Sequence, residues 1–360
     1  MTVSLADRSY PIVIGTGLLA RAADHTLEVC RPTHVAIVTQ PPVARHHVPA
    51  VAGSFRAKGI ETTLIEVPDG EASKSFSTLQ AVIDQMLAAR IPRQGCLVAL
   101  GGGVVGDLAG FAAAIHLRGI DFVQIPTSLL AMVDASVGGK TGINTPRGKN
   151  LVGAFWQPRL VLADLDALRT LPPRGRHAGM AEVIKHGVIA DPGLFDALEA
   201  APALAEPAED LLTLCVRRSC EIKAAVVAED ERETTGRRMI LNFGHTVGHA
   251  VENAGGYHDL HHGECVAIGM VVAAEMAAEL KTCPPEVPAR IEALCRAAQL
   301  PVRIPAMPWP RLLEAMRLDK KVQGDHLRFV LPTRIGEVII RGDVPLDLVE
   351  RVCRARGAIS

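Results

Sequence analysis

The sequence lacks the features that would direct it to the cell exterior or to a membrane. Its eight cysteines are scattered and form no Cys-x-x-Cys pair, a pattern typical of a reduced cytoplasmic enzyme and unlike a disulfide scaffold. The first residues do not resemble a secretory signal peptide. No apolar run reaches the roughly 20 residues of a membrane-spanning helix, because charged residues such as Asp107 and Glu264 interrupt the candidates. We expect a cytoplasmic protein.

An excess of charge of either sign is also absent. The chain has 38 Lys and Arg against 39 Asp and Glu, which gives a formal net charge of −1. This balance argues against a nucleic acid or an anionic membrane surface as the main partner, although basic residues can still gather at one site for a phosphorylated substrate. The length of 360 residues is enough for two domains, each with a core of its own.

The first half of the chain alternates strand-like and helix-like segments. Helices are predicted at about 43–58 and 75–90, and strands at 10–14, 35–39, 61–67, 96–100, 122–126 and 160–164. The strand at 96–100 is apolar throughout, as parallel strands covered on both faces are. The alternation predicts a Rossmann-like α/β layer.

The composition changes after Pro173. From residue 178 to about 317 the segments are long, helical and rich in Ala, Leu and Glu, and a short strand is predicted at 327–332. We therefore predict an α/β domain at residues 1–173 and a mainly α-helical domain at residues 174–360.

Histidines gather in the predicted helical domain. His245 and His249 are four residues apart, which places them on one face of a helix with Cβ atoms about 6 Å apart, and His262 opens the next helical run. Another apolar helix carries Glu182 and His186, and a buried carboxylate needs a partner. Two histidines and a glutamate suit Zn²⁺, with Co²⁺ and Fe²⁺ as alternatives, although such a histidine pair also occurs by chance.

Three Gly-rich or polar segments of the first half are candidates for an anionic ligand. The turn at 101–110 joins a buried strand to a helix, where a helix N-terminus can bind a pyrophosphate, but its spacing is not that of an ordinary dehydrogenase. In the segment 68–75, Asp69 or Glu71 could hold ribose hydroxyls, or Ser73 or Ser75 could simply cap a helix. The segment 127–150 places Lys140, Lys149 and neighbouring amides on Gly-rich turns.

These segments together resemble one known family. The stretches PDGEASKS, GGGVVGD, QIPTSLLAMVDASVGGKTGIN, GKNLVGAFWQP, AEVIKHG, LNFGHTVGHA and HGE are similar to those of the 3-dehydroquinate synthases, within the sugar-phosphate cyclase superfamily. The resemblance covers about residues 68–338. The sequence differs from the common pattern in Ser128, where threonine is usual, and in one extra residue near Thr234.

The resemblance implies NAD in the first domain, a divalent metal (Zn²⁺ or Co²⁺) in the second, and a homodimer. It implies Glu182, His245 and His262 as metal ligands, with His249 facing the substrate. The cofactor-binding residues that it implies are Asp69, Gly70, Glu71, Ala72, Ser73, Lys74, Gly103, Val104, Val105, Gly106, Asp107, Thr127, Ser128, Lys140, Lys149 and Thr170. The catalytic and substrate-holding residues are Arg118, Lys140, Asn150, Lys185, Lys223, Arg238, Asn242, His249 and one of Lys320 and Lys321.

The activity that the resemblance implies belongs to the shikimate pathway. 3-Deoxy-D-arabino-heptulosonate 7-phosphate would become 3-dehydroquinate and phosphate through transient oxidation by NAD, β-elimination of phosphate, reduction, ring opening and an intramolecular aldol step. Oxidation makes the neighbouring C–H proton acidic, which explains why a redox-neutral reaction needs NAD. The alternatives are a cyclase that makes 2-epi-5-epi-valiolone or 2-deoxy-scyllo-inosose, a metal-dependent polyol dehydrogenase, and a non-enzymatic relative.

Overall fold

The computed structural model describes residues 1–255, 260–320 and 327–360 and divides the chain into two units. Unit 1 comprises Met1–Pro172 together with Lys223–Arg232, and unit 2 comprises Pro173–Ile222 together with Glu233–Ser360. The return of Lys223–Arg232 to unit 1 differs from the uninterrupted second domain that we predicted, because sequence composition does not reveal which core a helix end joins.

Unit 1 is built on a seven-stranded sheet, which confirms the predicted α/β layer. Its strands, in sheet order, are β1 (Thr2–Val3), β2 (Tyr10–Gly15), β9 (Leu160–Asp164), β6 (Asp121–Pro126), β5 (Cys96–Gly101), β3 (His34–Thr39) and β4 (Glu61–Glu66). All neighbours pair in parallel except β1 with β2. Strands β3, β5 and β9 are buried along their whole length, as their continuous apolar runs predict.

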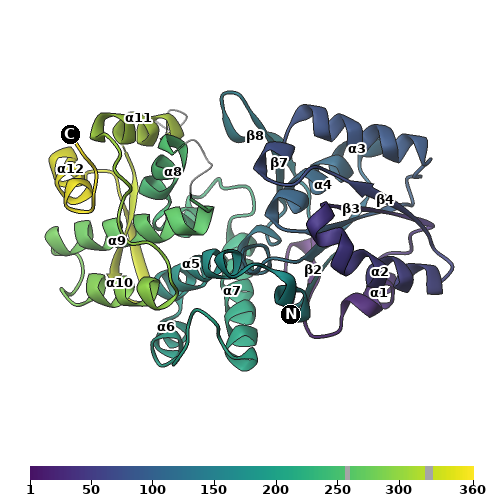
Figure 1. Ribbon diagram of the computed structural model, residues 1–360, viewed down its shortest axis with the longest axis horizontal. Helices are drawn as coiled ribbons and strands as arrows, with labels where there is room; N and C mark the ends of the chain where they lie inside the picture. Colours follow the sequence, from purple (N-terminus) through teal and green to yellow (C-terminus); the bar gives the residue numbers. More distant parts are fainter. Residues whose placement is uncertain (256–259, 321–326) are drawn as a thin grey trace. The chain divides into compact units, whose positions relative to one another are not determined.

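Helices cover both faces of this sheet. Helices α1 (Ala22–Val29) and α2 (Pro41–Ala57) lie on one face, and α3 (Phe76–Ala88) and α4 (Gly103–Ile115) lie on the other (Figure 1). The side chain of Ser75 accepts a hydrogen bond from the N–H of Thr78 and so caps α3. The capping interpretation of this serine is therefore confirmed.

A β-hairpin follows the strand β6, where we predicted only Gly-rich turns. It consists of β7 (Lys140–Thr145) and β8 (Gly148–Phe155), paired antiparallel. It packs on α4 at Gly110, where an added Cβ would lie 2.4 Å from the Thr141 methyl group. The contact holds the second half of the polar segment 127–150 against α4.

The strand order places three groups of the predicted cofactor residues at one edge of the sheet. They follow the carboxyl ends of parallel strands, with Asp69–Lys74 after β4, Gly103–Asp107 after β5, and Thr127 and Ser128 after β6. From β3 the chain moves outward to β4, and from β5 it moves the other way through β6 to β9. Open α/β sheets bind ligands outside the carboxyl ends of strands, where the order reverses in this manner.

Unit 2 is mainly helical. Its elements are α5 (Pro173–Ala190), α6 (Pro192–Glu199), most of α7 (Glu209–Glu229), α8 (His245–Ala254), α9 (His262–Glu279), α10 (Val287–Ala297), α11 (Trp309–Lys320), β10 (Phe329–Arg334), β11 (Glu337–Arg341) and α12 (Leu346–Ala355). The strand predicted at 327–332 corresponds to β10. Among the described residues, no helix is both long and apolar enough to cross a membrane.

Helix α9 is the centre of unit 2, and nearly all its residues are buried. Glycines let two other helices approach its backbone. A Cβ on Gly269 would lie 1.8 Å from the carbonyl oxygen of Gly244, which precedes α8, and a Cβ on Gly263 would lie 1.9 Å from the carbonyl oxygen of Ala178 in α5. These contacts bring the first turns of α8 and α9, which carry His245 and His262, close to the middle of α5, which carries Glu182.

We expect Gly269→Ala to destabilise unit 2 by about 1–3 kcal/mol, the usual cost of overpacking. The new methyl group would enter the first turn of α8, where the Gly248 N–H donates to the Gly244 carbonyl. Thermal unfolding measures the change. Gly53→Ala is the control: it lies inside α2 with open space at its Cβ, and should stabilise by roughly 0.5–1 kcal/mol. Equal melting temperatures for the two variants would contradict the close packing.

Candidate active site

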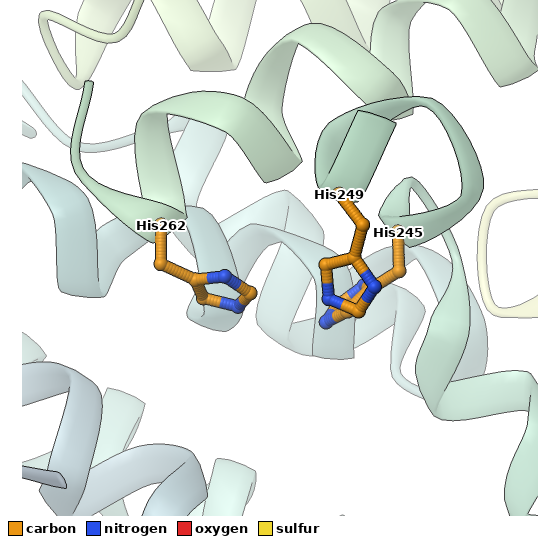
Figure 2. A group of neighbouring side chains, drawn as sticks. All are labelled: His245, His249 and His262. Atoms are coloured by element: carbon orange, nitrogen blue, oxygen red, sulfur yellow. The ribbon is translucent and has the colours of Figure 1, made fainter. Parts of the chain in front are cut away.

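Three imidazoles from two helices of unit 2 face one another (Figure 2). His245 and His249 lie on α8, and His262 is the first residue of α9. The ring centroids are 5.1 Å apart for His245 and His249, 5.4 Å for His245 and His262, and 5.7 Å for His249 and His262. The predicted pairing of His245 with His249 on one helical face, with His262 opposite, is thus present.

The carboxylate of Glu182 completes this group from α5. Its Oε1 lies 3.7 Å from Nε2 of His245 and 3.6 Å from Nε2 of His262, and the side chain is fully buried. Two ligands held about 2.1 Å from one tetrahedral Zn²⁺ are roughly 3.4 Å apart. The spacing of these three side chains therefore fits a metal ion. The three histidines by themselves also offer one ligand atom each, all within 4.8 Å of one another, so His249 is a further candidate for a ligand position.

Hydrogen bonds to the outer ring nitrogens orient the two histidines. Nδ1 of His245 lies 3.1 Å from the carbonyl oxygen of Phe243, and Nδ1 of His262 lies 3.2 Å from Oε2 of Glu252. Each ring therefore turns Nε2 toward Glu182. Our sequence analysis did not single out Glu252. The available signal was its position, because it lies seven residues after His245 and so on the same face of α8.

Buried charges determine how this group is protonated. The Lys185 ammonium pairs with the carboxylate of Glu182, one turn away on α5. Burial, assisted by the positive charge of Lys185, lowers the pKa of His245 to about 3. Burial also opposes a charge on His262, but hydrogen bonds to Glu182 and Glu252 outweigh it and raise the pKa of His262 to about 10. A metal ion bound by Nε2 of His262 would have to displace any proton held there.

The other residues of unit 2 that we predicted to hold the substrate differ in their exposure. Lys185 and Arg238 are buried, whereas Asn242 is exposed. Nε of Arg238 lies 3.6 Å from Oε1 of Glu233, a residue with left-handed φ of 58° in the loop that carries the extra residue. Lys321 lies outside the described residues, and nothing is described of the Lys320 side chain.

A hydrogen-bonded network in unit 1 joins residues that we predicted for cofactor and for substrate. Nζ of Lys74, which is 4% exposed, donates to Oδ2 of Asp107 at 2.7 Å and to Oδ1 of Asn150 at 2.5 Å. Burial raises the pKa of Asp107, and the charge of Lys74 opposes that rise. The Glu71 carboxylate extends the network, with Oε1 3.7 Å from Nζ of Lys149.

The Gly-rich turn lies beside the polar segment after β6. The N–H of Thr127 donates to the Gly101 carbonyl, and a Cβ on Gly102 would lie 3.4 Å from Oγ of Ser128. Gly103 opens α4, so residues 103–107 form its first turns with their N–H groups directed to the helix start. After β9, Thr170 Oγ1 lies 2.8 Å from Nε2 of His47.

Lys223, which we predicted as a substrate residue of the helical domain, belongs to unit 1. Its Nζ lies 2.8 Å from Oδ1 of Asp134, and the lysine is 6% exposed. We did not predict a role for Asp134, although a lone charged residue after the apolar run 129–133 was a usable signal. Arg118, with left-handed φ of 71°, and Lys140, at the start of β7, are exposed.

Solved structures similar to this one define the class of protein. A 2-epi-5-epi-valiolone synthase from Streptomyces hygroscopicus subsp. jinggangensis, with NAD⁺ and Zn²⁺ bound, is 29% identical with a TM-score of 0.89 over 98% of both chains. A 2-deoxy-scyllo-inosose synthase complexed with carbaglucose-6-phosphate, NAD⁺ and Co²⁺ is 26% identical with a TM-score of 0.88 over 99% of both chains. A glycerol dehydrogenase from Schizosaccharomyces pombe, 18% identical with a TM-score of 0.66 over 96% and 88%, shares the fold alone. The fold is that of the sugar phosphate cyclases.

Sequence comparison identifies the family within that class. The family descriptions "3-dehydroquinate synthase N-terminal" and "3-dehydroquinate synthase C-terminal" match residues 64–178 and 179–322. A 3-dehydroquinate synthase from Synechococcus sp. is 49% identical over 98% of this chain and 97% of its own length, and one from Rhodospirillum rubrum is 51% identical over 94% and 90%. The chain belongs to the 3-dehydroquinate synthase family.

We expect Glu182→Gln to lose its metal, because a neutral amide cannot replace the carboxylate next to both Nε2 atoms. The affinity for Zn²⁺ should fall by more than the about 10–100-fold that is typical when only a supporting residue is changed. Metal analysis after dialysis, followed by Zn²⁺ titration, measures the loss. Glu275→Gln is the control, because Glu275 pairs with Arg356 and not with a histidine. Full metal content in Glu182→Gln would remove Glu182 from the ligand set.

Proposed function

We propose that the chain acts as a 3-dehydroquinate synthase, which converts 3-deoxy-D-arabino-heptulosonate 7-phosphate into 3-dehydroquinate and phosphate. This reaction is a step of the shikimate pathway to chorismate and the aromatic amino acids. The observation that carries the proposal is the convergence of Glu182, His245 and His262, with Oε1 of Glu182 3.7 Å and 3.6 Å from the two Nε2 atoms. It occurs in a chain that is about half identical to enzymes with this name.

The residues present fit the two cofactors of this chemistry. Unit 2 offers the carboxylate and two imidazoles that suit Zn²⁺ or Co²⁺. Unit 1 offers the start of α4 for a pyrophosphate and the carboxylates of Glu71 and Asp107 for hydroxyl groups. When bound, NAD and the divalent ion supply hydride transfer and polarisation, which make an otherwise inert carbon-bound proton acidic.

The cofactor residues of unit 1 hold one another in place. Lys74 ties the loop after β4 to Asp107 on the second turn of α4, and to Asn150 on the hairpin. The N–H of Asn150 in turn donates to Oδ1 of Asn144, whose amide donates to Glu71. A ligand at the carboxyl edge of the sheet would therefore meet polar groups whose positions are already fixed, which lowers the entropic cost of binding.

Basic and amide side chains would bind the anionic groups of the substrate. We assign Arg118, Lys140, Asn150 and Lys223 of unit 1 to this task, together with Lys185, Arg238, Asn242 and one of Lys320 and Lys321 of unit 2. Lys223 and Lys185 are buried beside Asp134 and Glu182, which fixes their ammonium groups. Charge-assisted hydrogen bonds from fixed donors hold a carboxylate or a phosphate in one conformer.

His249 is our candidate for the proton carrier of the reaction. Its ring stands next to the rings of His245 and His262 but is not needed to complete the ligand set (Figure 2). Imidazole exchanges protons near neutral pH, which suits general acid–base catalysis on a substrate hydroxyl.

We also propose that the enzyme works in the cytoplasm as a homodimer. All eight cysteines lie in the described part of the chain and are free thiols, which suits a reducing compartment. The dimer rests on the family resemblance alone.

Phosphate release provides the direct test of function. We expect the purified enzyme to release phosphate from 3-deoxy-D-arabino-heptulosonate 7-phosphate only with both NAD⁺ and a divalent metal, and without accumulating NADH. Phosphate is measured colorimetrically, NADH by absorbance, and the carbocyclic product by mass spectrometry. Accumulation of NADH in proportion to substrate would indicate a polyol dehydrogenase. Cyclisation of a different sugar phosphate instead would indicate one of the other cyclases.

We expect His249→Ala to retain metal and NAD⁺ affinity within about twofold while losing about 10²–10⁴-fold in turnover, the usual contribution of general acid–base catalysis. The reason is that His249 is adjacent to the ligand set without completing it. Turnover is followed by phosphate release, and binding by titration. His245→Ala is the comparison, because that variant should lose the metal itself. Equal metal loss in the two variants would show that His249 is a ligand.

A further inference from the structure

The environment of Glu252 points to a role that the proposed reaction does not yet include. Glu252 lies on α8 and is 8% exposed. Its Oε2 is 3.2 Å from Nδ1 of His262, whose other nitrogen, Nε2, is 3.6 Å from Oε1 of Glu182. The imidazole of His262 is therefore held between two buried carboxylates that approach it from opposite ring nitrogens.

A buried carboxylate carries a large desolvation cost, which a specific partner must offset. The neighbours of Glu252 along α8 are mostly small or apolar, and the buried face of the helix includes Val247, Ala250 and Val251. Residues 245, 249 and 252 are spaced so that they share one face of the helix. The carboxylate is thus directed to the same region as the two histidines of α8.

The other predicted histidine ligand is held by the same kind of interaction. Nδ1 of His245 lies 3.1 Å from the Phe243 carbonyl, and its Nε2 faces Glu182. A carbonyl and a carboxylate are both acceptors only, so each requires that Nδ1 carry the ring proton. The Nε2 lone pair is then left for a cation, and the ring cannot rotate away from it.

We propose that Glu252 is a positioning residue of the metal centre: its carboxylate accepts the Nδ1–H of His262 and directs Nε2 of that ring toward the ion shared with Glu182 and His245. This inference rests on the proposed metal site and adds the residue that prepares one of its ligands. Glu252 itself touches neither the ion nor the substrate.

A purely structural role is the competing explanation. In that case the contact between Glu252 and His262 would only fasten α8 to α9. Those helices are already joined by close backbone contacts. A Cβ added at Gly248 would lie 2.9 Å from the carbonyl oxygen of Cys265, and one added at Gly269 would lie 1.8 Å from that of Gly244. The two explanations differ in what they predict for the ligand field of a bound ion.

The test uses Co²⁺ as the probe with metal-free full-length protein and its Glu252→Gln and Glu252→Ala variants. Visible absorption reports both the affinity for Co²⁺ and the geometry of its ligands. We expect the affinity to fall by about 10–100-fold, more for alanine than for glutamine, and the absorption bands at saturating Co²⁺ to shift. Glutamine keeps an acceptor oxygen, so its effect should be smaller than that of alanine. It still weakens the contact, because it loses the charge and can present its amide NH₂ to the ring instead.

Glu275→Gln is the matched control, since Glu275 is a partly buried, ion-paired glutamate of α9 away from the histidines. It should leave both affinity and absorption bands unchanged. Thermal unfolding verifies that each variant is folded, and if Glu252→Ala is not, Glu252→Gln decides alone. An affinity within twofold of the unaltered protein with the same bands would overturn the positioning role. Retention of Co²⁺ by Glu182→Gln would instead overturn the proposed ligand set, so the two failures are distinguishable.

Discussion

The close approach of α8 and α9 is the constraint on which the rest of the candidate site depends. The helices meet backbone to backbone, because Gly248 and Gly269 leave no room for a side chain between them. At this short separation the ring of His262 lies 5.4 Å and 5.7 Å, between centroids, from the rings of His245 and His249. Gly263 brings α9 equally close to α5, and the carboxylate of Glu182 thereby joins the imidazoles. A geometry set by main-chain contacts tolerates little drift, which suits ligands that must stay within tenths of an ångström.

Buried charge is arranged in opposite pairs in both units. Glu182 is paired with Lys185 in unit 2, whereas Lys74 is paired with Asp107 and Lys223 with Asp134 in unit 1. Pairs of this kind contribute little net stability, since desolvation offsets most of the attraction. Their value is in fixing donors and acceptors before a ligand arrives. An anionic sugar phosphate would then exchange its hydration shell for groups that need not reorganise.

The sequence predicted the parallel strands, the Gly-rich turn and the histidine-bearing helices, because each is recorded in a local pattern. Strand β5 is a continuous apolar run, and His245 and His249 have helical spacing. The hairpin β7–β8 escaped prediction because its glycines, such as Gly142 and Gly153, serve close strand contact and look like turn residues. Glu252 and Asp134 were missed for a different reason. The partner of Asp134 lies 89 residues along the chain and that of Glu252 lies on the next helix, and a single sequence does not show which side chains meet in space.

The segment Lys223–Arg232 has a consequence for any attempt to dissect the protein. It packs with unit 1 although fifty residues of unit 2 separate it from Pro172. Glu231 accepts hydrogen bonds from Arg8 and Gln157, and Lys223 neutralises Asp134. A gene fragment that stopped at Pro172 would therefore encode a sheet domain that lacks the segment Lys223–Arg232, which packs with it. The two units are therefore interleaved along the polypeptide.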